Sequence, residues 1–395
     1  MAQTFKKLRA LFFAILFFTS QTLYDFEGDK LDAHIKETLK IWNAPGLAIG
    51  IIKEGRIVFL KGYGLCEIGK PETINATTTF RIASVSKTIA AGLLTTFVQE
   101  GSLQWKDKII DHLPELKTQN NTSLNTMTLK HVLSNSTGFP RHTYTHLLDQ
   151  NTPYKKIITK LGDVKPICDL GQCHTYQNVI FSLSGHIAET LSNQNYETLL
   201  ETRIFQPLDM QNASCSCAAF KASPNKAMPH KKIKDGSYKA LPYNCRYYDV
   251  GSAAGVNASA ADMLKWLKEF LSDHPILFTK STINYMTQPH IETPDEIKRW
   301  NTQWRIARVK RADYGLGWRL FDYSGTPFIY HGGALQGYTA CLGMLPKQKI
   351  GIVVLTNSGS SFIADTIMAT FIDSVLDLKA IHYNAIRKKQ LNKML

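Results

Sequence analysis

The stretch Ile82-Ala-Ser-Val-Ser-Lys-Thr-Ile-Ala-Ala-Gly-Leu-Leu-Thr-Thr-Phe-Val98 predicts a largely apolar helix with Ser84 and Lys87 at its start. Residues three apart lie on one helix face, so this hydroxyl and this ammonium can touch. A lysine in a dry, cationic pocket can lose its proton near neutral pH and act as a base. The positive end of the helix favours an oxyanion beside Ser84. The stretch therefore predicts a nucleophilic serine with a lysine base.

The S-x-x-K pattern alone is weak evidence for such a site. Ser223-Pro-Asn-Lys226 also matches it, but that copy lies in a polar segment with no apolar helix behind it. We interpret the second copy as chance. The competing interpretation of Ser84 and Lys87 is a helix-capping serine beside a surface lysine.

Strand patterns lie at both ends of the chain. Leu47–Ile52 and Ile57–Tyr63 predict a hairpin, and four β-rich runs follow between residues 315 and 356. The middle, about residues 105–290, has mostly helical patterns broken by polar loops. These patterns predict one sheet assembled from residues 43–65 and 315–356, with a helical lobe inserted between them.

Two further segments carry residues suited to catalysis. Tyr176-Gln-Asn178 precedes an apolar helix, and a tyrosine beside a lysine ammonium can relay a proton. Asn178 offers a donor and an acceptor to a substrate amide. His331-Gly-Gly-Ala334 ends a β-run, and its glycines permit a close approach of another backbone. The backbone amides of Ser84 and Ala334 could then form an oxyanion hole.

The order S-x-x-K, Y-x-N and H-G-G resembles the penicillin-recognising serine enzymes, and the class C β-lactamases most closely. Other stretches are similar to the same group: Ala44–Gly50, Thr128–Ser134, Ser136–Pro140, Gly255–Met263, Tyr314–Trp318 and Ile350–Asn357. The resemblance implies an α/β chain of the α+β type, with a mainly antiparallel sheet flanked by helices plus the helical lobe.

The resemblance also implies a role for each site residue. Ser84 would be the nucleophile, and Lys87 and Tyr176 would share the roles of base and acid. Asn178 and the segment His331, Gly332, Gly333 and Ala334 would bind substrate, with the oxyanion hole formed by the Ser84 and Ala334 N–H groups. No cofactor or metal is implied.

The third motif departs from the Lys-Thr-Gly of most class C enzymes. His331 and Gly332 stand where those enzymes use lysine and threonine to bind the β-lactam carboxylate, and residues 359–365 offer no asparagine or arginine in their place. Such a histidine is more similar to D-aminopeptidases, esterases and the mitochondrial β-lactamase-like protein.

Three functions stay open after this comparison. The first is β-lactamase-type hydrolysis of a β-lactam or related amide, and the second is an esterase or D-amino-acid peptidase on the same scaffold. The third is a penicillin-binding sensor that is acylated without turnover. No G-x-S-x-G or H-E-x-x-H occurs, which disfavours an α/β-hydrolase or a zinc protease.

The N-terminus carries a targeting pattern. Lys6, Lys7 and Arg9 precede the apolar run Ala10–Phe18, which predicts a signal peptide or an anchor within residues 1–20. We expect an exported protein, periplasmic or secreted, or held at the inner membrane if residues 10–18 stay uncleaved. Residues 28–378 are predicted to form the hydrolase domain, and residues 379–395 a basic tail.

The formal net charge of +14 favours a solvated surface. Contact of the basic tail with anionic envelope polymers or lipid headgroups is the alternative. No nucleic-acid-binding motif occurs, so we expect no nucleic-acid partner. We expect a monomer that acts on a small molecule or short peptide.

The seven cysteines suit an oxidising compartment. Cys168 and Cys173 could bridge a short loop, and Cys215, Cys217 and Cys245 could supply a second bond. The odd number leaves at least one cysteine outside intramolecular pairs. A zinc site is disfavoured because Cys215-Ser-Cys217 lacks a second ligand pair at finger spacing.

Overall fold

The computed structural model describes residues 28–304 and 308–391. The predicted leader, residues 1–20, lies outside this part of the chain. Within the described ranges, no helix has both the length and the apolar character that crossing a bilayer requires.

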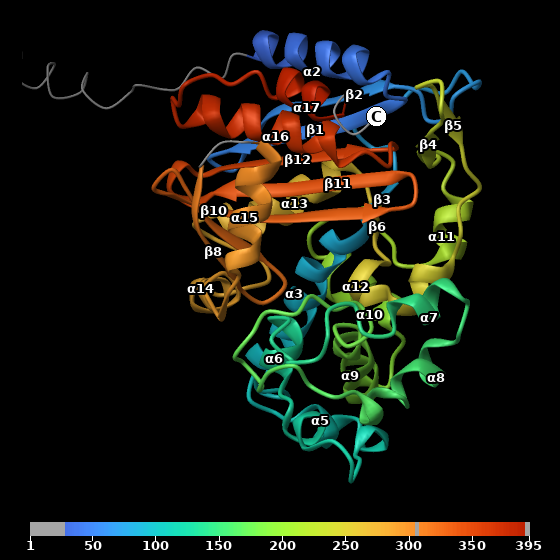
Figure 1. The fold of residues 1–395 in the computed structure, drawn as a ribbon, viewed down its shortest axis with the longest axis vertical. Coiled ribbons are helices and arrows are strands. Elements are labelled where there is room, and N and C mark those ends of the chain that lie inside the picture. The colour runs from blue at the N-terminus through green and yellow to red at the C-terminus, as the bar shows by residue number, and fades with distance from the viewer. Residues whose placement is uncertain (1–27, 305–307, 392–395) are drawn as a thin grey trace, which may run out of the picture.

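One eight-stranded antiparallel sheet organises the molecule (Figure 1). Its strands, in spatial order, are β2 (Arg56–Gly64), β1 (Gly46–Lys53), β12 (Ile350–Thr356), β11 (Tyr338–Leu345), β10 (Thr326–Leu335), β9 (Arg319–Tyr323), β8 (Val309–Tyr314) and β7 (Ile291–Glu292). The predicted antiparallel sheet built from both ends of the chain is therefore confirmed.

The two ends of the chain meet where β1 pairs with β12. The register runs from Leu47 opposite Thr356 to Lys53 opposite Ile350. Both strands are almost entirely buried, which explains why their sequences are continuous apolar runs rather than alternating patterns.

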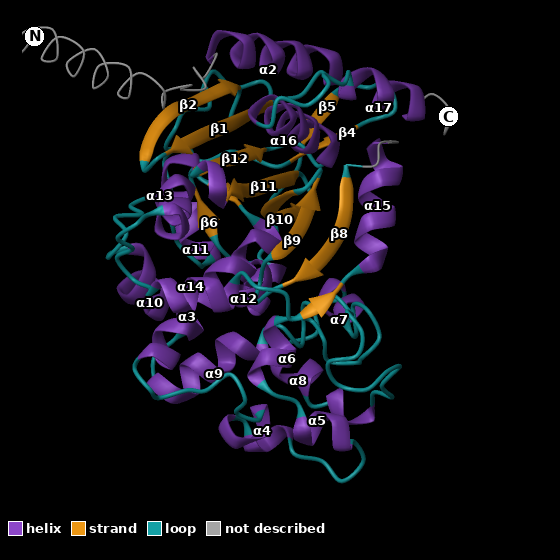
Figure 2. Ribbon diagram, turned by 90° about the vertical axis from the view of Figure 1, so that its left-hand side faces the viewer, coloured by secondary structure: helices purple, strands orange, loops and turns teal. Residues whose placement is uncertain are grey.

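Helices cover both faces of the sheet (Figure 2). One face packs against α2 (Gly28–Trp42), α15 (Pro294–Trp304), α16 (Ser361–Val375) and α17 (Tyr383–Leu391). The other face packs against α13 (Ala260–Leu271) and, next to β10 and β11, the 3-10 turn Ala83–Val85 and helix α3 (Ser86–Gln99).

The packed domain extends past residue 378. Asn384 in α17 accepts a hydrogen bond from the Trp42 indole at 2.9 Å and donates one to Thr38 at 2.9 Å. Tyr383 is buried and donates to Asp373 at 2.7 Å. Part of the segment predicted as a basic tail is thus a helix that joins α2 to α16.

The helical lobe lies below the sheet in Figure 1. Its helices are α4 (Ile109–His112), α5 (Thr122–Thr126), α6 (Leu129–Leu133), α7 (Thr145–Asp149), α8 (Tyr154–Ile158), α9 (Leu183–Ser192) and α10 (Tyr196–Leu200). Four smaller pieces connect it to the sheet: α11 (Cys217–Ala222), α12 (Gly251–Ala254), α14 (Lys280–Met286) and the paired strands β3 (Phe80–Arg81) and β6 (Asn257–Ala258).

A short hairpin and two disulfides stiffen the segments around the lobe. β4 (His230–Lys232) pairs with β5 (Tyr238–Ala240). Cys168 bonds to Cys173 as predicted, and Cys217 bonds to Cys245. Cys66, Cys215 and Cys341 are buried thiols.

The sheet is wider than the sequence predicted. β7 and β8 precede residue 315, and the exposed Lys310 and Arg311 mask the strand character of β8. Conversely, the predicted strand Gly315–Phe321 begins only at Arg319. Gly317, at φ +73°, passes against the backbone carbonyl of Lys87, where a side chain would collide with it. The turn at Gly317 that replaces the start of the predicted strand is therefore imposed by contact with α3.

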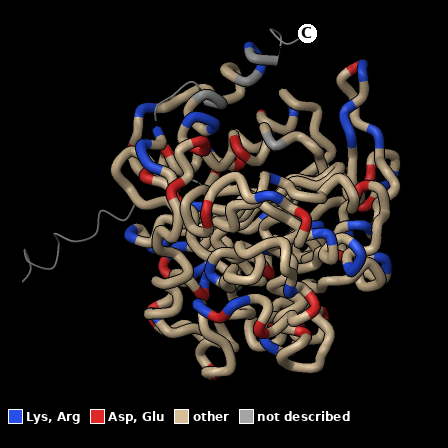
Figure 3. Tube along the Cα trace, turned by 60° about the horizontal axis from the view of Figure 1, so that its bottom comes forward, with Lys and Arg blue, Asp and Glu red and all other residues tan. Residues whose placement is uncertain are grey.

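Basic and acidic residues are interspersed over the described chain rather than gathered in one stripe (Figure 3). Several cations form surface ion pairs, such as Lys265 with Asp209 and Arg203 with Glu100. This distribution is typical of a solvated surface.

Candidate active site

Ser84 lies in the tight turn that leads into α3. Its side chain is partly exposed, whereas its neighbours Ala83 and Val85 are buried. Ala83 has φ +51°, a left-handed conformation that is costly for a residue with a Cβ and persists only where surrounding contacts impose it. Those contacts include Ser86, whose hydroxyl donates to Ala83 O at 2.6 Å and accepts from Val256 N at 3.0 Å.

Lys87 is completely buried in the first turn of α3. Its ammonium donates to Asn178 Oδ1 at 2.8 Å and to Ala253 O at 3.1 Å, and lies 4.6 Å from the Tyr176 ring centroid. Burial lowers the pKa of Lys87 below the ordinary lysine value, and the nearby charge of Arg319 lowers it further. The lysine can therefore give up its proton more readily than a surface lysine.

Tyr176 faces both Ser84 and Lys87. Burial opposes ionisation of this phenol, but the charges of Lys87 and Arg319, together with hydrogen bonds from Ser84 and Lys87, outweigh it and lower the pKa of Tyr176. The side chains of Ser84 and Lys87, from one segment, and of Tyr176, from a segment about ninety residues later, thus share one site. The predicted convergence of Ser84, Lys87 and Tyr176 is present.

Gln177, between Tyr176 and Asn178, fixes this segment in place. It is completely buried and donates from its backbone to Asn135 Oδ1 at 2.8 Å. Its side-chain amide donates to Pro140 O at 2.6 Å and accepts from Thr143 N at 3.0 Å. The sequence did not single out this residue, because a glutamine inside a short motif gives no sign of its partners.

Strand β10 closes the site from the other side and packs against the turn at Ala83–Val85. A side chain at Gly333 would collide with Ile82 O and come within 3.1 Å of Ser84 N. The glycine is required for this approach, which brings the exposed Ala334 beside Ser84.

His331, a residue of β10, is completely buried. Its Nε2 lies 3.0 Å from the Tyr314 hydroxyl, and its Nδ1 lies 2.9 Å from Gly332 O. Burial, followed by the charges of Arg319 and Lys87, holds the pKa of His331 well below the ordinary value. A neutral, buried imidazole cannot supply the positive charge that a lysine would offer a substrate carboxylate.

The second S-x-x-K copy has a different setting. Ser223 follows the end of α11, and Lys226 donates to the Ser223 carbonyl at 2.6 Å instead of to a site residue. Interpreting this copy as chance agrees with its geometry.

Comparison with known proteins identifies the scaffold. A model of the Beta-lactamase family matches residues 31–376. The chain belongs to this family of serine hydrolases. Protein flp of Staphylococcus aureus (strain MRSA252) is 26% identical over 344 residues, covering 85% of this chain and 64% of that protein. The chain thus spans less than two thirds of the length of that relative.

Two further proteins are similar to this chain over most of its length. Unguisins hydrolase ungD' of Aspergillus campestris is 22% identical over 369 residues, which cover 89% of this chain and 66% of that protein. The octameric penicillin-binding protein homologue from Pyrococcus abyssi has a TM-score of 0.77 and 25% identity, and the match covers 90% of this chain and 78% of that one.

Arg319 is a site residue of this Beta-lactamase family member that the sequence did not reveal. It lies on β9, is 8% exposed, and places its guanidinium 5.4 Å from the Tyr176 ring centroid. Glu296 on α15 pairs with it at 2.5 Å. Residues 359–365 offer no cation, and the structure instead places a buried, ion-paired arginine on β9, the strand next to β10. A single arginine in a strand carries no local signal of this role.

Replacing Arg319 with glutamine should move the acid limb of the kcat/KM–pH profile to higher pH. Arg319 lowers the pKa of both Tyr176 and Lys87, so its removal raises both, whichever group accepts the Ser84 proton. Pairing it with Glu296→Gln avoids leaving a buried carboxylate without its partner. Arg319→Lys should hold the limb nearer its original position. An unmoved limb in the double variant would contradict this electrostatic role.

Two cavities adjoin Ala334. The smaller, about 130 Å³, is lined by Arg319, Glu296 and Gly332 among others. The larger, about 280 Å³, is lined by Arg81, Asn244, Arg246 and Tyr247, among others. Both cavities share Ala334, the residue that follows the close approach of Gly333 to Ser84 N, so both lie next to the candidate site. No group of three or more potential metal-ligating side chains occurs within residues 28–304 and 308–391.

Proposed function

We propose that this Beta-lactamase family protein hydrolyses small esters or peptide amides through an acyl-enzyme at Ser84. The supporting observation is the buried contact of Lys87 and Tyr176 beside a partly exposed Ser84. A hydroxyl becomes a competent nucleophile only with such a base in reach.

In the first step, the Ser84 oxygen attacks the substrate carbonyl and its proton passes to the Lys87–Tyr176 pair. The oxyanion accepts hydrogen bonds from the Ser84 and Ala334 N–H groups. When the tetrahedral intermediate collapses, the bond to the leaving group breaks and Tyr176 returns the proton to the departing oxygen or nitrogen.

In the second step, water attacks the acyl-serine. The same pair accepts a proton from that water, and the carbonyl–Ser84 bond breaks. Ser84 regains its proton, and the carboxylic acid leaves. Asn178, held by Lys87 at 2.8 Å, is placed to orient an amide of the substrate.

The surroundings of β10 favour esters and linear amides over β-lactams. His331 is buried and neutral, Gly332 has no hydroxyl, and Glu296 neutralises Arg319. Within the described residues, the segment His331–Gly333 itself therefore offers no free cation to a β-lactam carboxylate at the position of the family's Lys-Thr-Gly.

A matched pair of substrates tests this preference. A chromogenic cephalosporin as the free acid should be hydrolysed no more than a few-fold faster than its methyl ester, because a charge-assisted contact would be worth roughly 10- to 100-fold. A short-chain nitrophenyl ester should be turned over with saturation. A strong preference for the free acid would contradict the proposal. Intact mass spectrometry separates turnover from a persistent adduct, which would indicate the sensor function instead.

We also propose that the protein works outside the cytoplasm. The bonds Cys168–Cys173 and Cys217–Cys245 support this, since disulfides persist in oxidising compartments. Fractionation of the producing cells, followed by mass analysis of the N-terminus, would test both export and cleavage of the leader.

A further inference from the structure

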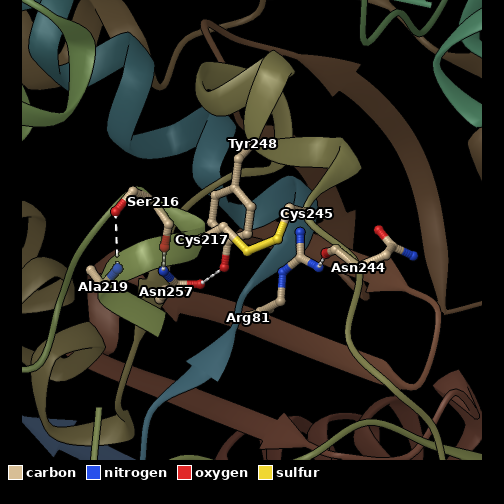
Figure 4. The surroundings of a disulfide bond; sticks show 8 residues. All are labelled: Arg81, Ser216, Cys217, Ala219, Asn244, Cys245, Tyr248 and Asn257. Carbon is tan, nitrogen blue, oxygen red and sulfur yellow. Dashed lines mark hydrogen bonds between the residues drawn. A yellow bond between two sulfur atoms is a disulfide. The ribbon is translucent and has the colours of Figure 1, made fainter. Parts of the chain in front are cut away.

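Arg81 is a buried cation that the proposed reaction does not use. It lies on β3, three residues before Ser84, and is 4% exposed. Its Nη1 donates to Asn244 O at 2.7 Å, and its guanidinium lies 4.5 Å from the Tyr248 ring centroid (Figure 4). These contacts fix the plane and orientation of the guanidinium.

The other edge of this guanidinium has no protein partner. Arg81 Nε and Nη2 are buried and form no hydrogen bond with any residue that the structure describes. These two nitrogens present parallel N–H groups, the geometry that binds a carboxylate through two hydrogen bonds. A buried cation without a counter-ion is unfavourable, and an anionic ligand would relieve that cost.

The surroundings of Arg81 form a pocket suited to such a ligand. We use the name Arg81 pocket for the 280 Å³ cavity lined by Arg81, Asp149, Asn244, Arg246, Tyr247 and Ala334, among others. The charges on this wall are two cations and one carboxylate, and Asp149 already accepts a hydrogen bond from the Tyr247 hydroxyl at 3.3 Å. The remaining charge favours an anion.

The proposed mechanism places the Arg81 pocket on the acyl side of the scissile bond. Tyr176, which would protonate the leaving group, lies near Arg319 and His331. Arg319 borders the smaller cavity, so the leaving group belongs there. The part of the substrate that stays on Ser84 must then extend past Ala334 into the Arg81 pocket.

We propose that the Arg81 pocket binds a carboxylate on the acyl part of the substrate, so that the protein prefers acyl groups with an acidic end. The inference rests on the proposed acyl-enzyme chemistry. The bond between Cys217 and Cys245 anchors the segment that carries Asn244 (Figure 4). Arg246 follows Cys245 directly, and both Asn244 and Arg246 line the pocket.

The test compares mono-4-nitrophenyl adipate with methyl 4-nitrophenyl adipate, which differ in one negative charge at the end of the acyl chain. Wild-type kcat/KM should be about 10- to 100-fold higher for the acid, the range expected of a charge-assisted hydrogen-bond pair. Arg81→Gln should bring that ratio close to one while the methyl ester is still hydrolysed. Arg81→Lys, which keeps the charge but loses the paired N–H edge, should fall between them.

The controls separate this inference from the reaction itself. Arg56→Gln removes an exposed charge on β2 and should leave the ratio unchanged. Arg246→Gln, on the pocket wall, should reduce the ratio by less than Arg81→Gln. A wild-type ratio near one would overturn the inference even if no Arg81 variant folds. Failure to hydrolyse the methyl ester would instead count against the acyl-enzyme proposal.

Discussion

Replacing Ser84 with alanine is expected to reduce kcat for every hydrolysed substrate by on the order of 10⁴- to 10⁶-fold, as with other serine nucleophiles. The hydroxyl supplies the atom that forms the covalent intermediate, so no neighbouring group can replace it. Its side chain is partly exposed, and its removal should cost little stability. Steady-state kinetics and intact mass after exposure to substrate would measure the loss of turnover and of the acyl adduct.

Ser223→Ala is the matched control, because Ser223 begins the second S-x-x-K copy. Its activity should stay within about twofold of wild type, as expected for a residue remote from the chemistry. Substantial hydrolysis by the Ser84→Ala protein, or an adduct mapped to another residue, would refute the assignment of the nucleophile.

Replacing Lys87 with methionine should lower kcat by about 10³-fold, in the range of general-base loss. Methionine retains an unbranched chain in the buried site but removes the proton acceptor. It also removes the charge that lowers the pKa of Tyr176, so Tyr176 becomes a poorer base at neutral pH. The residual activity should increase towards alkaline pH.

Stability must be measured for the same variant, because Lys87 donates to Asn178 and to Ala253 O inside the protein. Thermal unfolding by circular dichroism would show whether the loss of activity reflects unfolding. Lys226→Met, in the second copy of the motif, should retain near wild-type rates. Full activity in a folded Lys87→Met protein would exclude the lysine from proton transfer.

Local sequence patterns predicted those helices and strands that consist of an unbroken run of apolar residues. The hairpin of β1 and β2, strands β11 and β12 and helix α3 follow from apolar runs with clear ends. Strand β8 was not predicted, because the exposed Lys310 and Arg311 interrupt its run of buried residues. The structure assigns that strand through its pairing with β9, which a sequence pattern cannot display.

The residues of the candidate site also fall into those that the sequence predicts and those that only the structure reveals. Ser84, Lys87 and Tyr176 belong to short motifs in a fixed order, so they could be named from the sequence. Arg319 and Arg81 act through contacts with residues distant in sequence, and nothing adjacent to them distinguishes them from surface arginines. The second disulfide needed the fold as well, because Cys215 points into the core and lies near Gly251, leaving Cys217 for Cys245.

The pairing of β1 with β12 has a consequence for biosynthesis. A ribosome releases the hairpin of β1 and β2 long before Ile350–Thr356 emerges. Strand β1 therefore remains unpaired on one side until residues 297 to 309 positions later have been made. Contacts this distant slow folding and prolong exposure of apolar strands. We therefore expect the nascent chain to need protection from aggregation during synthesis. A premature stop codon before β12 would leave an insoluble product even though every catalytic side chain had been made.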